Sequence, residues 1–243
     1  MKLYKKGDHT SYTLGVFPTI ELLKNKSEYV QRVIVHSSIE KNSGYPLIVE
    51  LCEKNNIPID IHDKTINKLS PKGNCFAIGV FEKYEMSLSD DHHIVLVNPM
   101  DMGNMGTMIR TMLGFKYHNL AIVRPAVDIF DPKVIRSSMG ALFSMNIEYF
   151  DSFDDYYQRY SHHHLYPFML KGAKNIHGIE DDGLVSLIFG NESSGLDDCY
   201  LDYGQSLFIP HSEDIDSLNL SMALGIALFH FSKKDFINKD VLR

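Results

Sequence analysis

The sequence predicts an α/β protein whose larger, C-terminal part is built on a mostly parallel sheet. Short apolar runs rich in β-branched residues alternate along the chain with stretches of helical spacing. Several runs are continuously apolar, as is typical of strands covered on both faces. Two of them, Ile94–Asn98 and Leu184–Gly190, end in loops of small and polar residues. Open α/β sheets bind their ligands at such strand ends.

The first part of the chain predicts a small α/β domain. A polar turn opens residues 10–26, which then have helical spacing. A second helix is predicted at Pro46–Asn55 and a helical turn at Thr65–Leu69. The predicted strands are Val30–His36, Ile57–Ile61 and Cys75–Phe81. The polar stretch Tyr84–Asp91 has no core pattern, so we expect one domain at residues 1–88 and a second at 89–243.

The second domain continues the same alternation more strongly. Its predicted strands are Ile94–Asn98, Leu120–Val123, Asn146–Phe150, Leu165–Lys171, Leu184–Gly190 and Gln205–Pro210. Its predicted helices are Met105–Leu113, Pro132–Phe143, Phe153–Tyr160 and Leu218–Phe231. We expect Asn104 and Asp131 to be N-caps, Pro132 to be the first residue of its helix, and Gly114 to be a C-cap. The last helix is apolar almost all around, which predicts burial on most faces or a dimer seam.

Composition indicates a soluble cytoplasmic protein. The three cysteines are far apart and form no CxxC pair, which argues against zinc fingers and a disulfide framework. The N-terminus lacks the apolar segment of a signal peptide. The longest apolar stretch, Met222–Phe231, is too short to span a bilayer, so no membrane partner is expected.

Charge is unevenly distributed between the two parts. The chain has a net charge of −7, but residues 1–89 carry +2 and residues 90–243 carry −9. Phosphate binding depends on local patches rather than on total charge, so this balance neither supports nor excludes a nucleic acid. A run of three histidines, His162–His164, lacks a surrounding ligand set and is expected to be a solvated helix end, without a metal.

The motifs of several common enzyme classes are missing. The chain contains no GxG, so the dinucleotide fingerprint of a Rossmann sheet is absent, and it has no P-loop. It has no GxSxG elbow of a hydrolase either. The sequence therefore favours a site framed by two late loops, residues 190–195 and 210–219.

Three segments resemble the motifs of the SpoU (TrmH-like) RNA ribose methyltransferases of the SPOUT superfamily. They are NPMDMGNMGTMIRT at residues 98–111, GNESSGL at 190–196 and IPHSEDIDSLNLSMA at 209–223. The motifs occur in family order with near-family spacing, and the resemblance covers roughly residues 90–235. A looser resemblance, carried by LGVFPTIELLK and LSPKGNCFAIGV, relates residues 1–88 to a ribosomal-protein-like RNA-binding domain.

The resemblance implies a catalytic domain with a deep trefoil knot in its backbone, a feature that composition and periodicity do not reveal. It implies S-adenosylmethionine as the methyl donor, bound by Gly190, Ile209 and Leu218. It also implies a homodimer, with RNA as substrate, ribosomal RNA ahead of transfer RNA, and no DNA.

The resemblance further implies five polar site residues for methyl transfer to a ribose 2′-oxygen. They are Asn104, Arg110, Glu192, Ser217 and Asn219. Arg110 keeps its proton at ordinary pH, so we expect it to hold a phosphate and stabilise the 2′-oxyanion rather than act as a base. Glu192 is expected to orient Arg110 or Asn104.

One departure from the family pattern concerns the first motif. Pro99 and Asn104 are five residues apart, whereas many family members have two. The extra residues predict a longer loop over the acceptor site.

Two other functions remain open. One is an RNA-binding or assembly protein that has the fold but not the activity, a reading favoured by the acidic second part. The other is methylation of a base by the same fold. The five polar residues count against the first, and the triplet Ser217-Leu218-Asn219 resembles the ribose enzymes more than the base-methylating ones.

Overall fold

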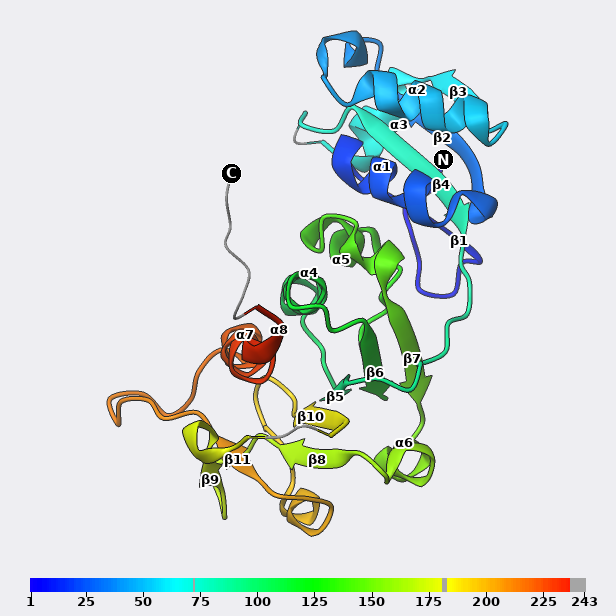
Figure 1. Ribbon diagram of the computed structural model, residues 1–243. Helices are drawn as coiled ribbons and strands as arrows, with labels where there is room; N and C mark the ends of the chain where they lie inside the picture. Colours follow the sequence, from blue (N-terminus) through cyan, green and yellow to red (C-terminus); the bar gives the residue numbers. More distant parts are fainter. Residues whose placement is uncertain (72, 181–182, 237–243) are drawn as a thin grey trace. The chain divides into compact units, whose positions relative to one another are not determined.

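The computed structural model describes residues 1–71, 73–180 and 183–236, which form two compact units (Figure 1). The first unit contains Met1–Glu85 and two pieces from further along the chain, Met105–Arg110 and Asp128–Ser144. The second unit contains the other described residues.

A four-stranded sheet forms the centre of the first unit. Its strand order is β1-β4-β2-β3, with β2 parallel to β3 and the other two pairs antiparallel. The strands are β1 (Thr10–Tyr12), β2 (Val30–Val35), β3 (Ile59–Ile61) and β4 (Ala77–Glu82). The helices are α1 (Val16–Asn25), α2 (Tyr45–Lys54) and α3 (Asp63–Leu69).

The residues of β2 show how this sheet is covered, because successive side chains of a strand point to opposite faces. Val33 and Val35 pack in a core with buried residues of α1 and α2. Ile34, between them, packs in a second core with Ile66 and Leu69 of α3. Helices therefore cover both faces. The predicted polar turn is wrong at Thr10–Tyr12, which form the edge strand β1 against β4.

The predicted helix Pro132–Phe143 ends early. Helix α5 (Pro132–Ser137) begins after Asp131, whose side chain accepts the N–H of Lys133, as predicted. Met139 and Gly140 then take positive φ angles of 54° and 82°, and the chain continues as the 3-10 helix η3 (Ala141–Ser144). A Cβ on Gly140 would lie 3.0 Å from Cα of Pro18, so this segment packs closely against α1.

A parallel five-stranded sheet forms the centre of the second unit, as predicted. Its strand order is β7-β6-β5-β10-β8, and all four pairs are parallel. The strands are β5 (His93–Val97), β6 (Asn119–Val123), β7 (Asn146–Phe150), β8 (His164–Pro167) and β10 (Val185–Phe189). Every residue of β5, β6 and β10 is buried, which explains why these strands are apolar apart from His93, Asn119 and Ser186.

Four helices belong wholly or partly to this unit. They are α4 (Met102–Gly114), α6 (Phe153–Tyr160), α7 (Leu220–Phe231) and α8 (Lys233–Phe236). The predicted strand Gln205–Pro210 is wrong in extent. Only β11 (Leu207–Phe208) is a strand, and it pairs with β9 (Lys174–Asn175) in a separate two-stranded sheet.

The predicted caps of α4 are wrong. The helix begins at Met102, and its N-cap is Asp101, whose carboxylate accepts the N–H of Asn104 at 2.6 Å. Asp is as good an N-cap as Asn, and Asp101 stands three residues earlier, so Asn104 lies inside the first turn. Gly114 is the last helical residue, and the positive φ of 63° falls on Lys116.

Gly106 marks a tight crossing of α4 with α5. A Cβ added there would lie 1.8 Å from Oγ of Ser137 and 2.7 Å from the backbone nitrogen of Ser138. We expect Gly106→Ala to lower the free energy of unfolding by about 1–3 kcal/mol through overpacking. Gly114→Ala on the same helix, with nothing within 4 Å of the added Cβ, is the matched control and should not destabilise. Denaturant unfolding measures both, and equal stabilities would contradict the tight crossing.

Helix α7 exposes one apolar face, so the prediction of burial on most faces is wrong for the single chain. Its buried residues are Leu224, Ala227 and Leu228. Its exposed large side chains are Met222 at 61%, Ile226 at 40% and Phe229 at 70% exposure. The spacing of four and three residues places these three on one side of the helix.

A chain of buried polar side chains links β5, α6 and β10. Nδ1 of His93 bonds the Tyr156 hydroxyl at 2.8 Å, which bonds Oγ of Ser186 at 2.6 Å, which bonds Nδ1 of His163 at 2.8 Å. Burial lowers the pKa of His93 to about 4 and also lowers the pKa of His163. The predicted solvated histidine run is therefore wrong for His163, although His162 and His164 are exposed.

No helix in the described parts of the chain combines the length and apolar character needed to cross a membrane. The cysteines are free: Cys52 and Cys75 are buried, and Cys199 is exposed.

Candidate active site

A cavity of about 410 Å³ lies in the second unit at the carboxyl end of β10. Its walls come from the residues after β8, the loop after β10, the segment around β11 and the start of α7. Five of the predicted site residues line it: Gly190, Glu192, Ile209, Ser217 and Leu218. The two late loops therefore frame one pocket, as the sequence predicts.

Asn191 holds the loop after β10 in shape. Its backbone exchanges two hydrogen bonds with Gly195, at 3.2 and 2.9 Å. Its side-chain Oδ1 accepts the N–H groups of Ser193 and Ser194. Its Nδ2 donates to the carbonyl of Asn98 at the end of β5, at 2.7 Å. One side chain thus shapes this loop and ties it to the neighbouring strand.

Gly190 stands where the loop folds back on itself. A Cβ at this position would lie 2.1 Å from the carbonyl carbon and oxygen of Gly195 and 2.4 Å from the backbone nitrogen of Leu196. These are backbone atoms, so no rotamer change relieves the clash. Only glycine allows the loop to close at this position. The missing side chain would also let a ligand come close to the backbone.

The Glu192 carboxylate fastens the second motif to the first. Its two oxygens accept the backbone N–H of Met100 at 3.2 Å and of Asp101 at 3.0 Å. The sequence predicted Arg110 or Asn104 as its partner. The structure instead gives backbone donors of the short segment between β5 and α4. The predicted longer loop is wrong, because α4 begins at Met102 and two of the residues between Pro99 and Asn104 lie in its first turn.

Asn104 and Asn219 join the first motif to the third. Nδ2 of Asn219 donates to Oδ1 of Asn104 at 3.5 Å, the long end of the hydrogen-bond range. Oδ1 of Asn219 accepts the N–H of Ser221 at 3.0 Å and its hydroxyl at 2.7 Å, which makes Asn219 the N-cap of α7. Asn219 therefore both caps α7 and contacts the first motif.

Arg110 lies on α4, in the part of that helix that belongs to the first unit. It is exposed, and the described residues offer its guanidinium neither a hydrogen bond nor an ion pair. No carboxylate of the described residues therefore holds the Arg110 side chain. Arg110 follows Asn104 by six positions, which separates the two side chains by roughly 120° around the helix.

Four residues of the cavity wall were not predicted as site residues: Phe168, Phe189, Asn191 and His211. The rings of Phe168 and Phe189 stack with centroids 4.5 Å apart, at the ends of the neighbouring strands β8 and β10. His211 bonds the carbonyl of Ile209 through Nδ1 at 2.8 Å. Asn191 shapes the loop after β10, as described above. Asn191 and His211 stand inside the quoted motifs, but the pairing of the two phenylalanines follows from strand order, which the sequence does not give.

A separate hollow of about 550 Å³ belongs to the first unit. It is lined by residues 6–10 together with Glu82 and Lys83, and it contains no residue of the three motifs. It is therefore a weaker candidate for the chemistry that the motifs carry.

A parallel α/β sheet with a ligand-sized cavity at the carboxyl ends of its strands defines a small-molecule-binding α/β protein. Residues 91–229 match the SpoU rRNA Methylase family. Because this match covers more than half of the chain, the chain belongs to that family.

Known proteins related to this chain are RNA methyltransferases by name. A 23S rRNA (adenosine(1067)-2'-O)-methyltransferase of Streptomyces azureus is 26% identical over 193 residues, which are 74% of this chain and 72% of that protein. An uncharacterised tRNA/rRNA methyltransferase of Synechocystis sp. is 25% identical over 146 residues, 59% of this chain. The chain spans about half of that relative, 53% of its length.

The fold is shared with solved structures over nearly the whole chain. The crystal structure of the SpoU methyltransferase AviRb from Streptomyces viridochromogenes has a TM-score of 0.80 at 19% identity, covering 95% of this chain and 91% of that one.

Proposed function

We propose that this chain is an S-adenosylmethionine-dependent methyltransferase that acts on a ribose 2′-oxygen of structured RNA. The observation that carries this proposal is one cavity that is lined by two distant motifs, which are joined to the third motif by hydrogen bonds. The second and third motifs line it, and Glu192 and Asn219 bond residues of the first. Family membership and the names of the relatives support the same reaction.

The residues of the cavity fit S-adenosylmethionine. A volume of about 410 Å³ lies in the ordinary range for small-ligand pockets. Ile209, Leu218 and the Phe189 ring give the cavity an apolar wall that would suit the donor, and Gly190 presents backbone with no side chain over it. We assign Gly190, Ile209 and Leu218 to the donor. When bound, the donor supplies a methyl group already activated by a sulfonium.

Bound S-adenosylmethionine would supply the methyl group to the ribose 2′-oxygen and would leave as a neutral thioether that keeps the carbon–sulfur electron pair, while the 2′ proton would pass to solvent water. The protein contributes positioning and electrostatic stabilisation. Arg110 holds a phosphate and stabilises negative charge on the 2′-oxygen. Asn104, Ser217 and Asn219 hydrogen-bond the ribose, and Glu192 keeps the loop before α4 in place.

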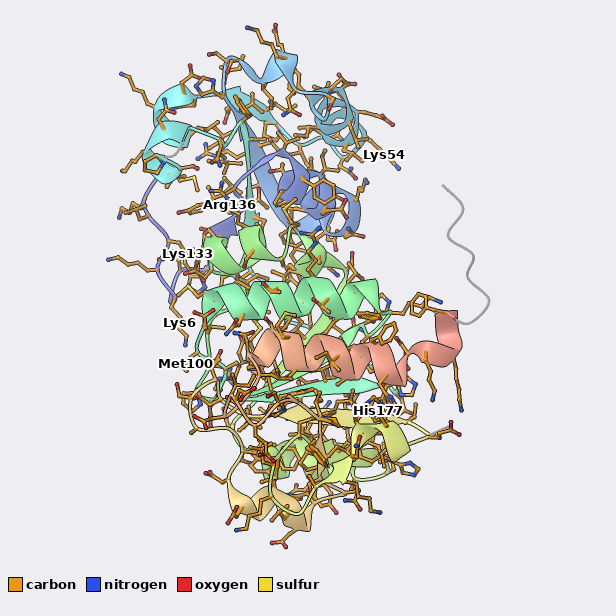
Figure 2. All side chains as sticks on the ribbon, turned by 90° about the vertical axis from the view of Figure 1, so that its left-hand side faces the viewer. Lys6, Lys54, Met100, Lys133, Arg136 and His177 are labelled. Carbon is orange, nitrogen blue, oxygen red and sulfur yellow. The ribbon has the colours of Figure 1, made fainter. Side chains whose placement is uncertain are left out.

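RNA is the proposed partner, ribosomal RNA ahead of transfer RNA, and DNA is not expected. We assign residues 1–88 to a ribosomal-protein-like RNA-binding domain and residues 89–243 to the methyltransferase domain. Residues 1–89 carry a net +2, whereas the rest carries −9. The later pieces of the first unit add Arg110, Lys133 and Arg136 against Asp128 and Asp131, so this unit keeps a small positive excess (Figure 2). Such cations supply the phosphate contacts that dominate RNA affinity.

We also propose a trefoil knot in the second domain and a cytoplasmic location. The insertion of β10 between β5 and β8 supports a chain path of the knotted kind, and family membership favours it. Free cysteines are in keeping with a reducing compartment.

A homodimer is proposed through the exposed apolar face of α7. Phe229→Asp should convert the dimer to a monomer, because it places a charge at the most exposed of the three apolar side chains, 70% exposed. Sedimentation velocity measures the change. Phe17→Asp, at a 52% exposed phenylalanine of α1, is the control and should stay dimeric. A wild-type monomer, or an unchanged Phe229→Asp dimer, would remove this interface.

The experiment that tests the function is incubation of the purified protein with isotope-labelled S-adenosylmethionine and unmodified total RNA, followed by nucleoside mass spectrometry. A labelled 2′-O-methyl nucleoside is the expected product, and its position distinguishes ribosomal from transfer RNA. A labelled base would assign the base-methylating alternative. Donor binding without product would favour the non-catalytic RNA-binding protein, and no donor binding would overturn the methyltransferase.

A further inference from the structure

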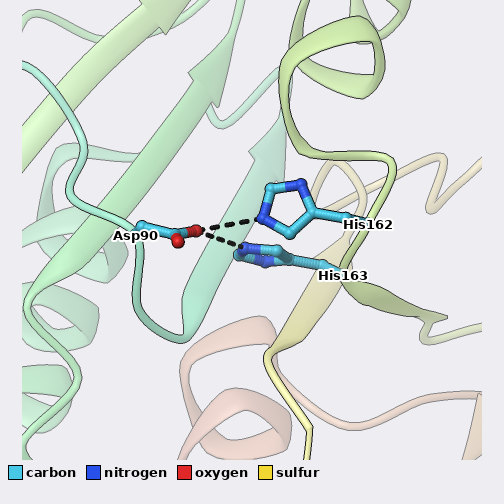
Figure 3. A group of neighbouring side chains, drawn as sticks. All are labelled: Asp90, His162 and His163. Carbon is cyan, nitrogen blue, oxygen red and sulfur yellow. Dashed lines mark hydrogen bonds and ion pairs between the residues drawn. The ribbon is translucent and has the colours of Figure 1, made fainter.

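Three side chains with metal-ligating atoms meet in the second unit, at the amino edge of its parallel sheet (Figure 3). Asp90 lies just before β5, and His162 and His163 lie in the turn between α6 and β8. The strands β5 and β8 are the two neighbours of β10 in the sheet. One ligand atom from each lies within 4.8 Å of the others. Oδ1 of Asp90 is 3.0 Å from Nε2 of His162 and 3.7 Å from Nε2 of His163.

His163 distinguishes this cluster from an ordinary surface ion pair. Its side chain is wholly buried, and its Nε2 has no hydrogen-bond partner among the described residues. A buried ring nitrogen that has only this longer contact with a carboxylate and no hydrogen bond is costly, and few native side chains leave one. The atom faces Asp90, so a ligand bound between the two would satisfy it.

The other side of the His163 ring is held in the way that metal-binding histidines are held. Nδ1 lies 2.8 Å from Oγ of Ser186, which is also bonded to the Tyr156 hydroxyl. An N–H at Nδ1 that donates to Ser186 leaves the lone pair on Nε2, facing Asp90. Fixing the tautomer through the second ring nitrogen is the usual outer-shell support of a histidine ligand.

The donor set selects the class of ion. Two imidazoles and one carboxylate suit a borderline divalent metal, with zinc the foremost, and a water completes four-coordination. With bonds of about 2.0–2.1 Å, ligand atoms of a tetrahedral zinc site lie roughly 3.3 Å apart. The two observed separations, 3.0 and 3.7 Å, bracket that distance. Asp90 and His162 are exposed, at 72% and 53%, which leaves the ion a path from solvent.

We propose that Asp90, His162 and His163 bind a divalent transition-metal ion, zinc in the first place. The ion fastens the segment before β5 to the turn between α6 and β8. This is a structural site, because it lies at the amino ends of parallel strands, whereas the candidate active site lies at the carboxyl end of β10, about 15 Å further along the sheet. The site does not depend on the proposed methyl transfer.

The test uses the full chain, treated with a chelator and dialysed, and zinc chloride as the probe. Calorimetric titration should give one ion per chain with a Kd in the micromolar range or below. Zinc at a hundredfold excess over that Kd should raise the unfolding midpoint by about 5 °C or more.

His162→Ala and Asp90→Asn remove exposed ligands, so neither should disturb the core. Each is expected to weaken zinc binding at least tenfold and to reduce the midpoint shift to about half or less at the same zinc concentration. His177→Ala removes another exposed histidine (Figure 2) and should bind like the wild type. Absence of saturable binding, or wild-type binding by both ligand variants, would overturn the site.

Discussion

Replacing Arg110 with alanine is expected to reduce methyl transfer at saturating RNA by about 10²–10³-fold, the usual cost of removing one group that stabilises a transition-state charge. The guanidinium is exposed and has no partner among the described residues, so its removal breaks no internal contact. Donor affinity, measured by calorimetry, should change little, because Arg110 is assigned to the RNA and not to the donor.

Two further variants sharpen this prediction. Arg110→Lys keeps the charge but loses the planar fork, so it should recover only part of the rate. Arg32→Ala removes another exposed arginine, whose ion pair with Asp60 is solvent-accessible, and should keep the wild-type turnover at saturating RNA. Equal losses of donor binding and methyl transfer in Arg110→Ala would show that Arg110 belongs to the donor pocket or to the fold.

Gly190→Ala is expected to weaken S-adenosylmethionine binding by a hundredfold or more. The added Cβ would sit 2.1 Å from backbone atoms of Gly195, so the loop after β10 must open. That loop provides a wall of the cavity, and its opening removes the shape to which the donor binds. Overpacking should also cost about 1–3 kcal/mol of stability.

The matched control is Gly178→Ala, where nothing lies within 4 Å of the added Cβ and φ is not positive. Calorimetry gives the affinity, and circular dichroism confirms that both variants are folded. Wild-type donor affinity in a folded Gly190→Ala variant would contradict the role of this loop closure.

Four elements of the second unit were predicted almost to the residue. Asn146–Phe150 and Phe153–Tyr160 have the predicted bounds, and β5 and β10 agree to within a residue at either end. Burial on both faces makes such strands continuously apolar, a strong local signal. The failures lie where long-range contacts decide the structure. The strand β1 has only three residues, and it forms because it pairs with β4.

The sequence predicted five residues that line the cavity, but not the hydrogen bonds that join the site segments to one another. Family motifs identified five residues of the cavity wall, because glycine and polar side chains at strand ends are visible in one sequence. The partner of Glu192 was not visible, since it is backbone of a loop almost a hundred residues away. The role of Asn191 was also missed, because it depends on the closeness of Asn98, which only the strand order provides.

The place of β10 in the sheet also has a consequence for how the second unit folds. The register sets Ser186 opposite His93, 93 residues earlier, and Ser186 also stands opposite Leu165. Until β10 is in place, β5 and β8 share no neighbour, and each presents an unpaired edge. Pairings this distant along a chain are slow to form, since loop closure precedes any gain from contact. The second unit should therefore fold slowly, with the insertion of its central strand as the late step.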